Sequence, residues 1–173
     1  MLRKTLAVLM VLSGLVQVSP AQGSPGASKG NNSVANFSGT WVMNVDKSDL
    51  GEMPRPKSQT LTITQTVGEV KVAFVSENEM GKLSYNYSAK LDGTETPFPS
   101  DAFPAESPFR IVSSKAALKG NTLVVMQKTS IQQMEGSLTT TYLLSADGKL
   151  LMAASHIAFG DAGFDTKTVY EKK

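Results

Sequence analysis

The sequence predicts an all-β protein, an antiparallel up-and-down β-barrel of about eight to ten strands. Beyond residue 36, apolar and polar residues alternate with a period of two, which is typical of strands with one buried face. Glycine-containing turn pairs divide these segments at short intervals, as in a meander of hairpins. A sheet of so many strands leaves two unpaired edges unless it closes, so we expect closure.

The first half of this region contains four alternating segments. Each carries apolar or aromatic side chains at every second position, so one face of each strand is expected to be buried. The segments cover residues 37–45, 60–64, 70–75 and 83–91.

The second half contains five further segments of the same kind, again predicted as strands. They cover residues 109–113 with an extension toward 118, then 122–131, 137–145, 149–159 and 164–171. Chain reversals are predicted at Asp92-Gly93, Gly120-Asn121 and Asp147-Gly148, because these pairs adopt positive φ at low cost.

Two connections interrupt the alternation. Residues 49–57 include Pro54 and Pro56 and predict a stiff link between the first two strands. Residues 94–108 form an unusually long connection, rich in proline, that contains two phenylalanines. Two interpretations of it remain: a packed surface loop whose phenylalanines cover one end of the barrel, or a lid over an opening.

The N-terminal residues 1–21 have the three parts of an export signal. Arg3 and Lys4 give a basic start, residues 6–16 are almost wholly apolar, and small residues follow. The apolar run is shorter than the ~20 residues that cross a bilayer, which indicates a cleaved signal rather than an anchor.

Cleavage is predicted after Ala21 or, as a second choice, after Gly23. Residues 22–35 are poor in apolar side chains and are predicted to be a flexible leader. Residues 36–173 then form one barrel domain.

Composition narrows the partners and the compartment. The chain has no cysteine, which excludes disulfides, thiol catalysis and thiolate metal sites and favours a bacterial periplasmic or secreted location. The net charge is +2, and without Arg3 and Lys4 the 17 basic residues become 15, equal to the 15 acidic ones. Without a basic run, we expect neither nucleic acid nor an anionic membrane as partner.

The inward faces of the predicted strands carry the candidate ligand-binding residues of the barrel interior. Such aromatic and methionine side chains either line an apolar pocket or simply fill the barrel, and both interpretations remain. The set comprises Trp41, Met43, Phe74, Tyr85 and Tyr87.

No pattern of catalytic residues is found. The chain lacks a strand-to-helix nucleophile motif, and its carboxylates fall on polar faces, turns or the long connection. We therefore predict no enzyme, no catalytic residue, no metal site and no cofactor. The expected function is an exported, non-catalytic barrel that binds a small apolar or amphipathic molecule. The alternative is a structural or envelope-interaction module with a filled interior and no ligand.

Five short motifs carry a resemblance to known barrels. The opening Phe37-Ser38-Gly39-Thr40-Trp41 resembles the first strand of the calycins, the lipocalins and fatty-acid-binding proteins, in which Gly-x-Trp closes the barrel bottom. Most of residues 36–173 resembles more closely a group of uncharacterised bacterial secreted proteins described as lipocalin-like. The other motifs are Ser114-Lys115-Ala116, Gly120-Asn121-Thr122-Leu123-Val124, Leu144-Ser145-Ala146-Asp147-Gly148-Lys149 and Val169-Tyr170-Glu171-Lys172. The resemblance implies a lipocalin-like barrel and export, but no ligand-binding residue.

The chain departs from these families in three respects. Lipocalins stack an arginine of a late strand on the indole of Gly-x-Trp, whereas the late strands here contain no arginine. Fatty-acid-binding proteins place two helices after the first strand, where this chain has Pro54 and Pro56. Thr139-Thr140-Thr141-Tyr142 lacks the aspartate of the lipocalin Thr-Asp-Tyr turn element.

His156 is the only histidine of the chain. In heme-binding relatives of this fold one histidine ligates the iron, but the position of His156 in the alternation predicts an outward side chain.

Overall fold

A computed structural model describes residues 34–79, 81–99, 101–103 and 107–173. The predicted signal of residues 1–21 lies outside these ranges, as do both cleavage positions and residues 22–33 of the predicted leader. Within the described ranges, no helix combines the length and apolar character needed to cross a membrane.

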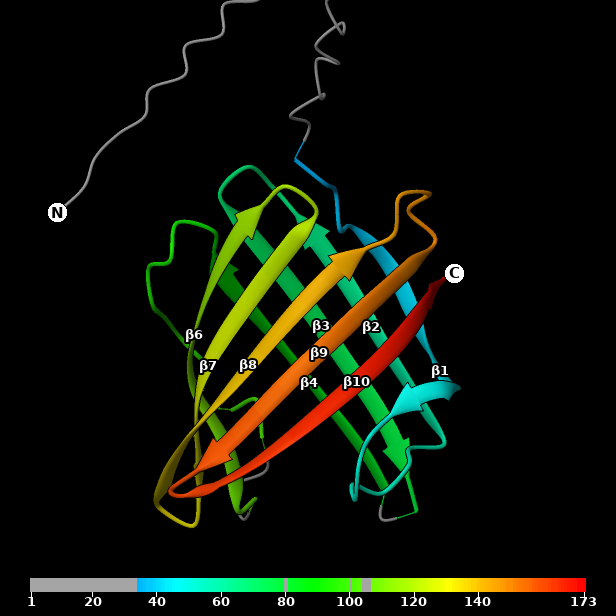
Figure 1. Cartoon of the computed structure of the whole chain (residues 1–173). Coiled ribbons are helices and arrows are strands. Elements are labelled where there is room, and N and C mark those ends of the chain that lie inside the picture. The colour runs from blue at the N-terminus through cyan, green and yellow to red at the C-terminus, as the bar shows by residue number, and fades with distance from the viewer. Residues whose placement is uncertain (1–33, 80, 100, 104–106) are drawn as a thin grey trace, which may run out of the picture. The chain divides into compact units, whose positions relative to one another are not determined.

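Ten antiparallel strands form one sheet in which all neighbours in sequence except β4 and β5 pair in space (Figure 1). All nine strands predicted from the alternation are present, and β5 is an additional two-residue strand inside the long connection. The first and last strands, β1 and β10, also pair, with Trp41 opposite Lys172. The bounds are β1 (Gly39–Asp49), β2 (Ser58–Gln65), β3 (Glu69–Asn78), β4 (Gly81–Lys90), β5 (Thr96–Pro97), β6 (Phe109–Lys119), β7 (Thr122–Ile131), β8 (Met134–Leu144), β9 (Leu150–Phe159) and β10 (Ala162–Lys172).

The barrel is nearly closed, with one seam between β4 and β6. Instead of a continuous ladder, single hydrogen bonds cross this seam. Ser114 Oγ donates to the carbonyl of Ser88 at 2.8 Å, and the N–H of Gly93 donates to the carbonyl of Ala116 at 3.1 Å. Closure is therefore as expected, but the final join is made by a side chain and a turn.

The connection 94–108 closes the lower part of this seam. Phe98 and Phe103 are 7% and 5% exposed, and their rings lie 5.8 and 5.3 Å from the ring of Tyr85 on β4. Phe103 also contacts Phe109 of β6 at 5.7 Å. The phenylalanines are packed, as one of the two interpretations predicts.

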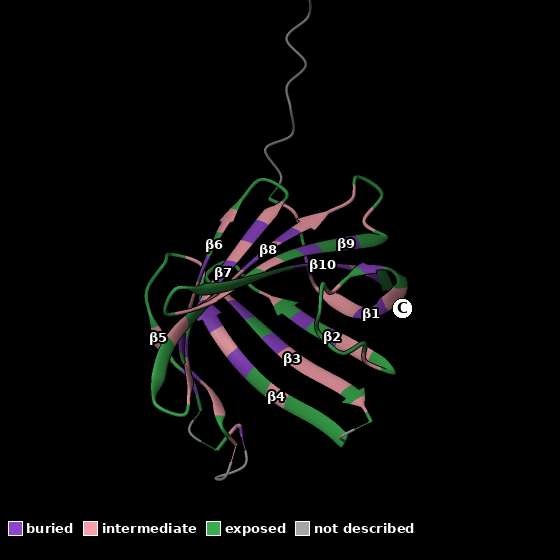
Figure 2. Ribbon diagram, turned by 60° about the horizontal axis from the view of Figure 1, so that its bottom comes forward, coloured by how far each residue is buried: buried purple, intermediate pink, exposed green. Residues whose placement is uncertain are grey.

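The alternation of buried and exposed residues shows which face of each strand points inward. Figure 2 shows the buried bands recurring along β3 and β4. On β9, Leu151 and Ala153 are buried while Met152 and His156 are exposed, as predicted. The alternation therefore assigns the inward face of β9 correctly.

Trp41 closes the end of the barrel at which β1 begins. Its side chain is fully buried, and its indole Nε1 donates to the carbonyl of Phe37 at 2.9 Å. Lys172 Nζ lies 5.1 Å from the centre of the Trp41 ring, within the range of a cation–π contact. A lysine of the last strand thus lies over the indole ring, where lipocalins place an arginine.

Gly39 explains why glycine precedes this tryptophan. Its φ is +145°, a conformation that side chains disfavour, and an added Cβ would lie 2.8 Å from Lys172 Cε. The segment before β1 is fixed to the same end. Gln65 accepts from the N–H of Phe37 and donates to the carbonyl of Ala35.

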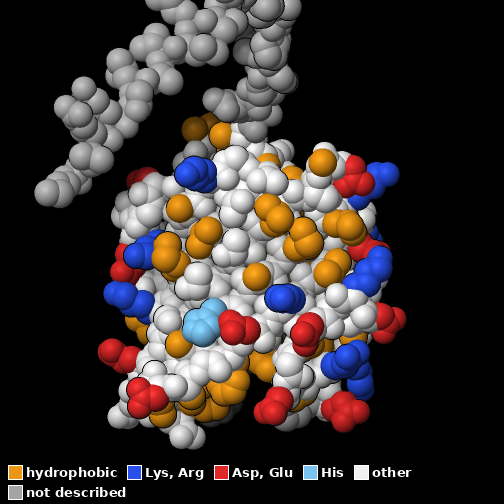
Figure 3. All heavy atoms as spheres, in the orientation of Figure 1, with side chains coloured by type: hydrophobic (Ala, Val, Ile, Leu, Met, Phe, Trp, Pro, Cys, Tyr) orange, Lys and Arg blue, Asp and Glu red, His pale blue; other side chains and the backbone are white. Residues whose placement is uncertain are grey.

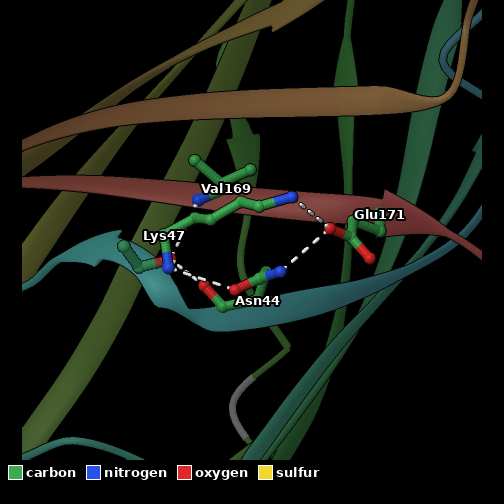
Figure 4. A network of polar contacts seen from close by, with 5 residues as sticks. Asn44, Lys47, Val169 and Glu171 are labelled. Carbon is green, nitrogen blue, oxygen red and sulfur yellow. Dashed lines mark hydrogen bonds and ion pairs between the residues drawn. The ribbon is translucent and has the colours of Figure 1, made fainter.

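A bulge bends β1 before its end. The pairing with β10 shifts register between Asn44 and Asp49, and the Ser48 hydroxyl donates to the carbonyl of Asn44 and accepts from the N–H of Val169. Asn44 and Lys47 both donate to Glu171 Oε1, at 2.9 and 3.0 Å (Figure 4). These side-chain contacts replace the ladder where the strand curves toward the β1–β2 connection.

The β7–β8 hairpin turns through two residues that are poorly suited to it. Gln132 and Gln133 both have positive φ, 49° and 73°, in a position where Asn-Gly is preferred.

We expect the double change Gln132→Asn and Gln133→Gly to raise the free energy of unfolding by about 1 kcal/mol, because it removes backbone strain. Urea unfolding measures this change in the free energy of unfolding. Gly160→Ala, at φ 55° with open space for a Cβ, is the matched control and should destabilise by a similar amount. Equal urea midpoints for the wild type, the double variant and Gly160→Ala would contradict backbone strain at Gln132 and Gln133.

Candidate ligand-binding cavity

A cavity of about 220 Å³ lies inside the barrel, in the half away from Trp41. The other half is filled, because Phe37, Trp41, Leu123 and Leu151 are fully buried there. The interior is thus neither wholly filled nor wholly hollow. The lining residues are Leu50, Met53, Gln59, Leu61, Val72, Phe74, Tyr85, Tyr87, Gln127, Leu138, Thr140, Tyr142, Ala153, Ser155, Ile157, Thr166, Thr168 and Tyr170.

One wall of the cavity is aromatic. Phe74 of β3 pairs with Tyr85 of β4, and their rings stack with centres 4.7 Å apart. Tyr87 follows on the same face of β4, 6.4 Å from Tyr85, and is 7% exposed. Phe98 contacts both tyrosines from the seam, with ring centres 5.8 and 5.6 Å away, so the wall belongs to one aromatic cluster.

The facing wall is polar and uncharged. Thr140 of β8 pairs with Ser155 of β9, which in turn pairs with Thr166 of β10, so three hydroxyl side chains form a row. The hydroxyls of Thr140 and Ser155 lie 3.0 Å apart. The strand order places β8–β10 across the barrel from β3 and β4, and Figure 1 shows β9 and β10 in front of them.

Two glutamines extend the polar lining. Gln59 donates from Nε2 to the hydroxyl of Tyr170, whereas Gln127 is 6% exposed and its Nε2 has no hydrogen-bond partner among the described residues. A buried donor without a partner costs about 1–3 kcal/mol. Gln127 is therefore the polar group of the cavity that the barrel itself leaves unsatisfied.

All four tyrosines of the chain line this cavity. Burial raises the pKa of Tyr142 to about 12, opposed by its interaction with Tyr87. Burial also raises the pKa of Tyr87 and of Tyr170 well above the usual value, and the nearby Tyr142 adds to both shifts. The pKa of Tyr85 is raised for the same two reasons, although its side chain is partly exposed. The phenols are therefore neutral hydrogen-bonding groups at physiological pH.

The mouth of the cavity lies beside the connection between β1 and β2. Leu50 and Met53 of this connection line the cavity, and Met53 is 40% exposed. Figure 3 shows the surface indented at the lower edge of the view, the end at which β1 leads into this connection in Figure 1. Residues 50–57 form turns and irregular structure instead of helices, in line with Pro54 and Pro56. The connection 49–57 therefore borders the opening.

The sequence-predicted candidate residues separate into two groups. Phe74, Tyr85 and Tyr87 line the cavity, whereas Trp41 and Met43 are buried outside its lining. Sequence reasoning missed the polar wall, both glutamines and the two residues at the mouth. The alternation of β10 placed Thr166 and Thr168 on the face of Tyr170, which was the available signal for polar side chains inside the barrel.

Two features of the described residues bear on metal and heme binding. Among them, no cluster of three or more His, Asp or Glu residues is arranged to hold a metal ion. His156 lies on the outer surface, as predicted, and its Nδ1 is 2.8 Å from a carboxylate oxygen of Asp165 on β10 (Figure 3). A heme ligand would have to face the interior.

Comparisons with known proteins bear on the fold. No protein-family model matches the chain, and no curated protein matches it. The structure is similar to the crystal structure of zebrafish ileal bile acid-binding protein complexed with cholic acid. The TM-score is 0.52 at 12% sequence identity, and the match covers 79% of this chain and 98% of the zebrafish protein. The chain therefore has a calycin-like, nearly closed β-barrel fold, as the opening motif predicts; the bacterial secreted relatives stay a prediction.

Proposed function

We propose that this protein is an exported, non-catalytic β-barrel that holds a small apolar or amphipathic molecule in its interior. The observation that carries the proposal is the cavity of about 220 Å³, which is bordered by stacked aromatic rings and opens beside residues 50–57. The similar zebrafish barrel was crystallised with cholic acid, so a barrel of this fold accommodates a small organic ligand. Residues 1–21 support export through their basic start and apolar run.

The cavity favours this function over a purely structural module. A module with a filled interior would leave no space beneath the open end, yet Phe74, Tyr85 and Ile157 border a cavity there. The described lining residues also include no acidic or basic pair suited to proton transfer, which supports a binding role rather than catalysis.

Filling the cavity should abolish binding. Ala153 lines the cavity and is 4% exposed, while the next residue, Ala154, points outward. We expect Ala153→Leu to weaken the binding of ligands that co-purify or are found by screening by at least about tenfold, because the new side chain occupies their space. Ala154→Leu is the matched control and should leave affinity unchanged. Native mass spectrometry and tyrosine difference absorbance report binding, since all four tyrosines border the cavity. Equal affinities in the two variants would remove the interior as the binding site.

A further inference from the structure

The cavity carries hydrogen-bonding groups but no formal charge. None of the described residues that line it is Asp, Glu, Lys, Arg or His. Its ionisable side chains are tyrosines, which are neutral at pH 7 and whose pKa burial raises further. Moving an ion from water into such a site is costly when no opposite charge meets it. The interior therefore disfavours carboxylates, phosphates and amines.

The two walls of the cavity are complementary to different surfaces of a ligand. Phe74 and Tyr85 form an apolar aromatic surface on one side, which suits an apolar part of the ligand. Across the barrel, the row of Thr140, Ser155 and Thr166 presents hydroxyls that both donate and accept hydrogen bonds. A ligand that satisfies both walls is apolar on one side and carries neutral oxygen on the other.

Gln127 sets the position of that oxygen. It lies on β7 two residues from Val125, which pairs with Thr140, so the side chains of Gln127 and Thr140 line the cavity from neighbouring strands. Its Nε2 is buried without a partner among the described residues. A ligand oxygen that accepts from this amide would satisfy a donor that the empty barrel leaves unpaired.

The size of the cavity restricts the ligand further. Its volume of about 220 Å³ is below the ~300–1,000 Å³ of sites for drug-sized molecules. The space corresponds to one small ring system rather than to a long chain or a large polycyclic molecule.

We propose that the cavity binds a small uncharged ring compound that packs on Phe74 and Tyr85 and accepts a hydrogen bond from Gln127 through an alcohol or carbonyl oxygen. The proposal rests on the proposed function and adds the class of ligand: neutral cyclic alcohols, ketones and lactones, to the exclusion of organic acids.

Three probes of one ring shape test the proposal on the wild-type protein. These are 2-naphthol, which is neutral with an oxygen; 2-naphthoate, which is charged; and naphthalene, which has no oxygen. We expect 2-naphthol to bind most tightly and 2-naphthoate about 100-fold more weakly, measured by probe fluorescence and calorimetry near pH 7. Naphthalene should lie between them, because it gains the aromatic wall without the hydrogen bond.

The variant Gln127→Leu tests the donor. It should weaken 2-naphthol about tenfold and leave naphthalene unchanged or tighter, so naphthalene binding also shows that the variant retains its fold. Thr140→Val, which removes one hydroxyl at nearly constant shape, is a second variant and should weaken 2-naphthol alone.

The outcomes separate the two proposals. Binding of 2-naphthoate as tight as that of 2-naphthol would overturn the exclusion of acids and leave the proposed function standing. Unchanged 2-naphthol affinity in Gln127→Leu would overturn the role of Gln127. Failure of all three probes, with no effect of Ala153→Leu on any other ligand, would overturn the proposed function itself.

Discussion

Replacing Trp41 by alanine is expected to lower the free energy of unfolding by about 3–5 kcal/mol. The indole is fully buried at the closed end of the barrel and lies beneath Lys172 of the last strand. Its loss leaves a large cavity and removes the donor that satisfies the carbonyl of Phe37. Urea unfolding followed by far-UV circular dichroism measures the change, since the variant lacks the tryptophan signal.

Two milder variants divide this effect into its parts. Trp41→Phe keeps most of the apolar volume but loses the Nε1–H donor, so we expect a cost of about 1–3 kcal/mol. Lys172→Met removes the cation above the ring and should cost about 0.5–1 kcal/mol at this solvent-facing position. An unchanged urea midpoint in Trp41→Ala would exclude the indole from the core. Ligand affinity should change little in the milder variants, because Trp41 does not line the cavity.

Alkaline pH is expected to unfold the barrel cooperatively. Folding raises the pKa of Tyr87, Tyr142 and Tyr170 above the value of ~10 in an unfolded chain. Above pH ~10 the unfolded state therefore binds fewer protons than the native state, and stability falls as pH rises. The stabilisation is fully present below pH ~10 and is lost as pH approaches the native pKa, about 12 for Tyr142.

The expected size of this loss is large. Each buried tyrosine contributes about 1.4 kcal/mol per pH unit in this window, so three contribute about 4 kcal/mol per unit. One pH unit therefore removes a large part of the ~5–15 kcal/mol that holds a domain together. Tyr85, whose pKa burial also raises, adds to the loss.

Tyrosinate absorbance and far-UV circular dichroism, recorded together, test this expectation. The two transitions should coincide above pH ~10, whereas the chain in urea should titrate near pH ~10 without a structural change. Tyrosines that ionise near pH ~10 while the sheet persists would show that they are not shielded from solvent. Tyr142→Phe should make the transition less steep, because one titrating group is lost.

The local sequence was sufficient for the strands and for their inward faces. Period-two alternation located all nine long strands, and the glycines of the three predicted turn pairs do have positive φ. It also placed His156 outside and Trp41 inside. These features depend on backbone sterics and on which side of a strand is buried, and both are local properties.

The position of the cavity could not be read in the same way. Alternation gives Trp41 and Phe74 the same inward direction, but it does not give their heights along the barrel axis. Trp41 pairs with Leu61 and Leu61 pairs with Phe74, yet Phe74 lines the cavity and Trp41 does not. Connections have no periodicity, so the positions of residues 49–57 and 94–108 could be assigned only from their contacts in the structure.

The sequence by itself determined an all-β chain, its turns, the inward faces of its strands and the tryptophan at one end. The tertiary structure alone decided where the interior stays empty, that hydroxyls of β8, β9 and β10 meet in one row, and that Gln127 lacks a partner. The reason is physical: a cavity is the space left when side chains from strands distant in sequence fail to meet. That space depends on closure and register, which no single segment encodes.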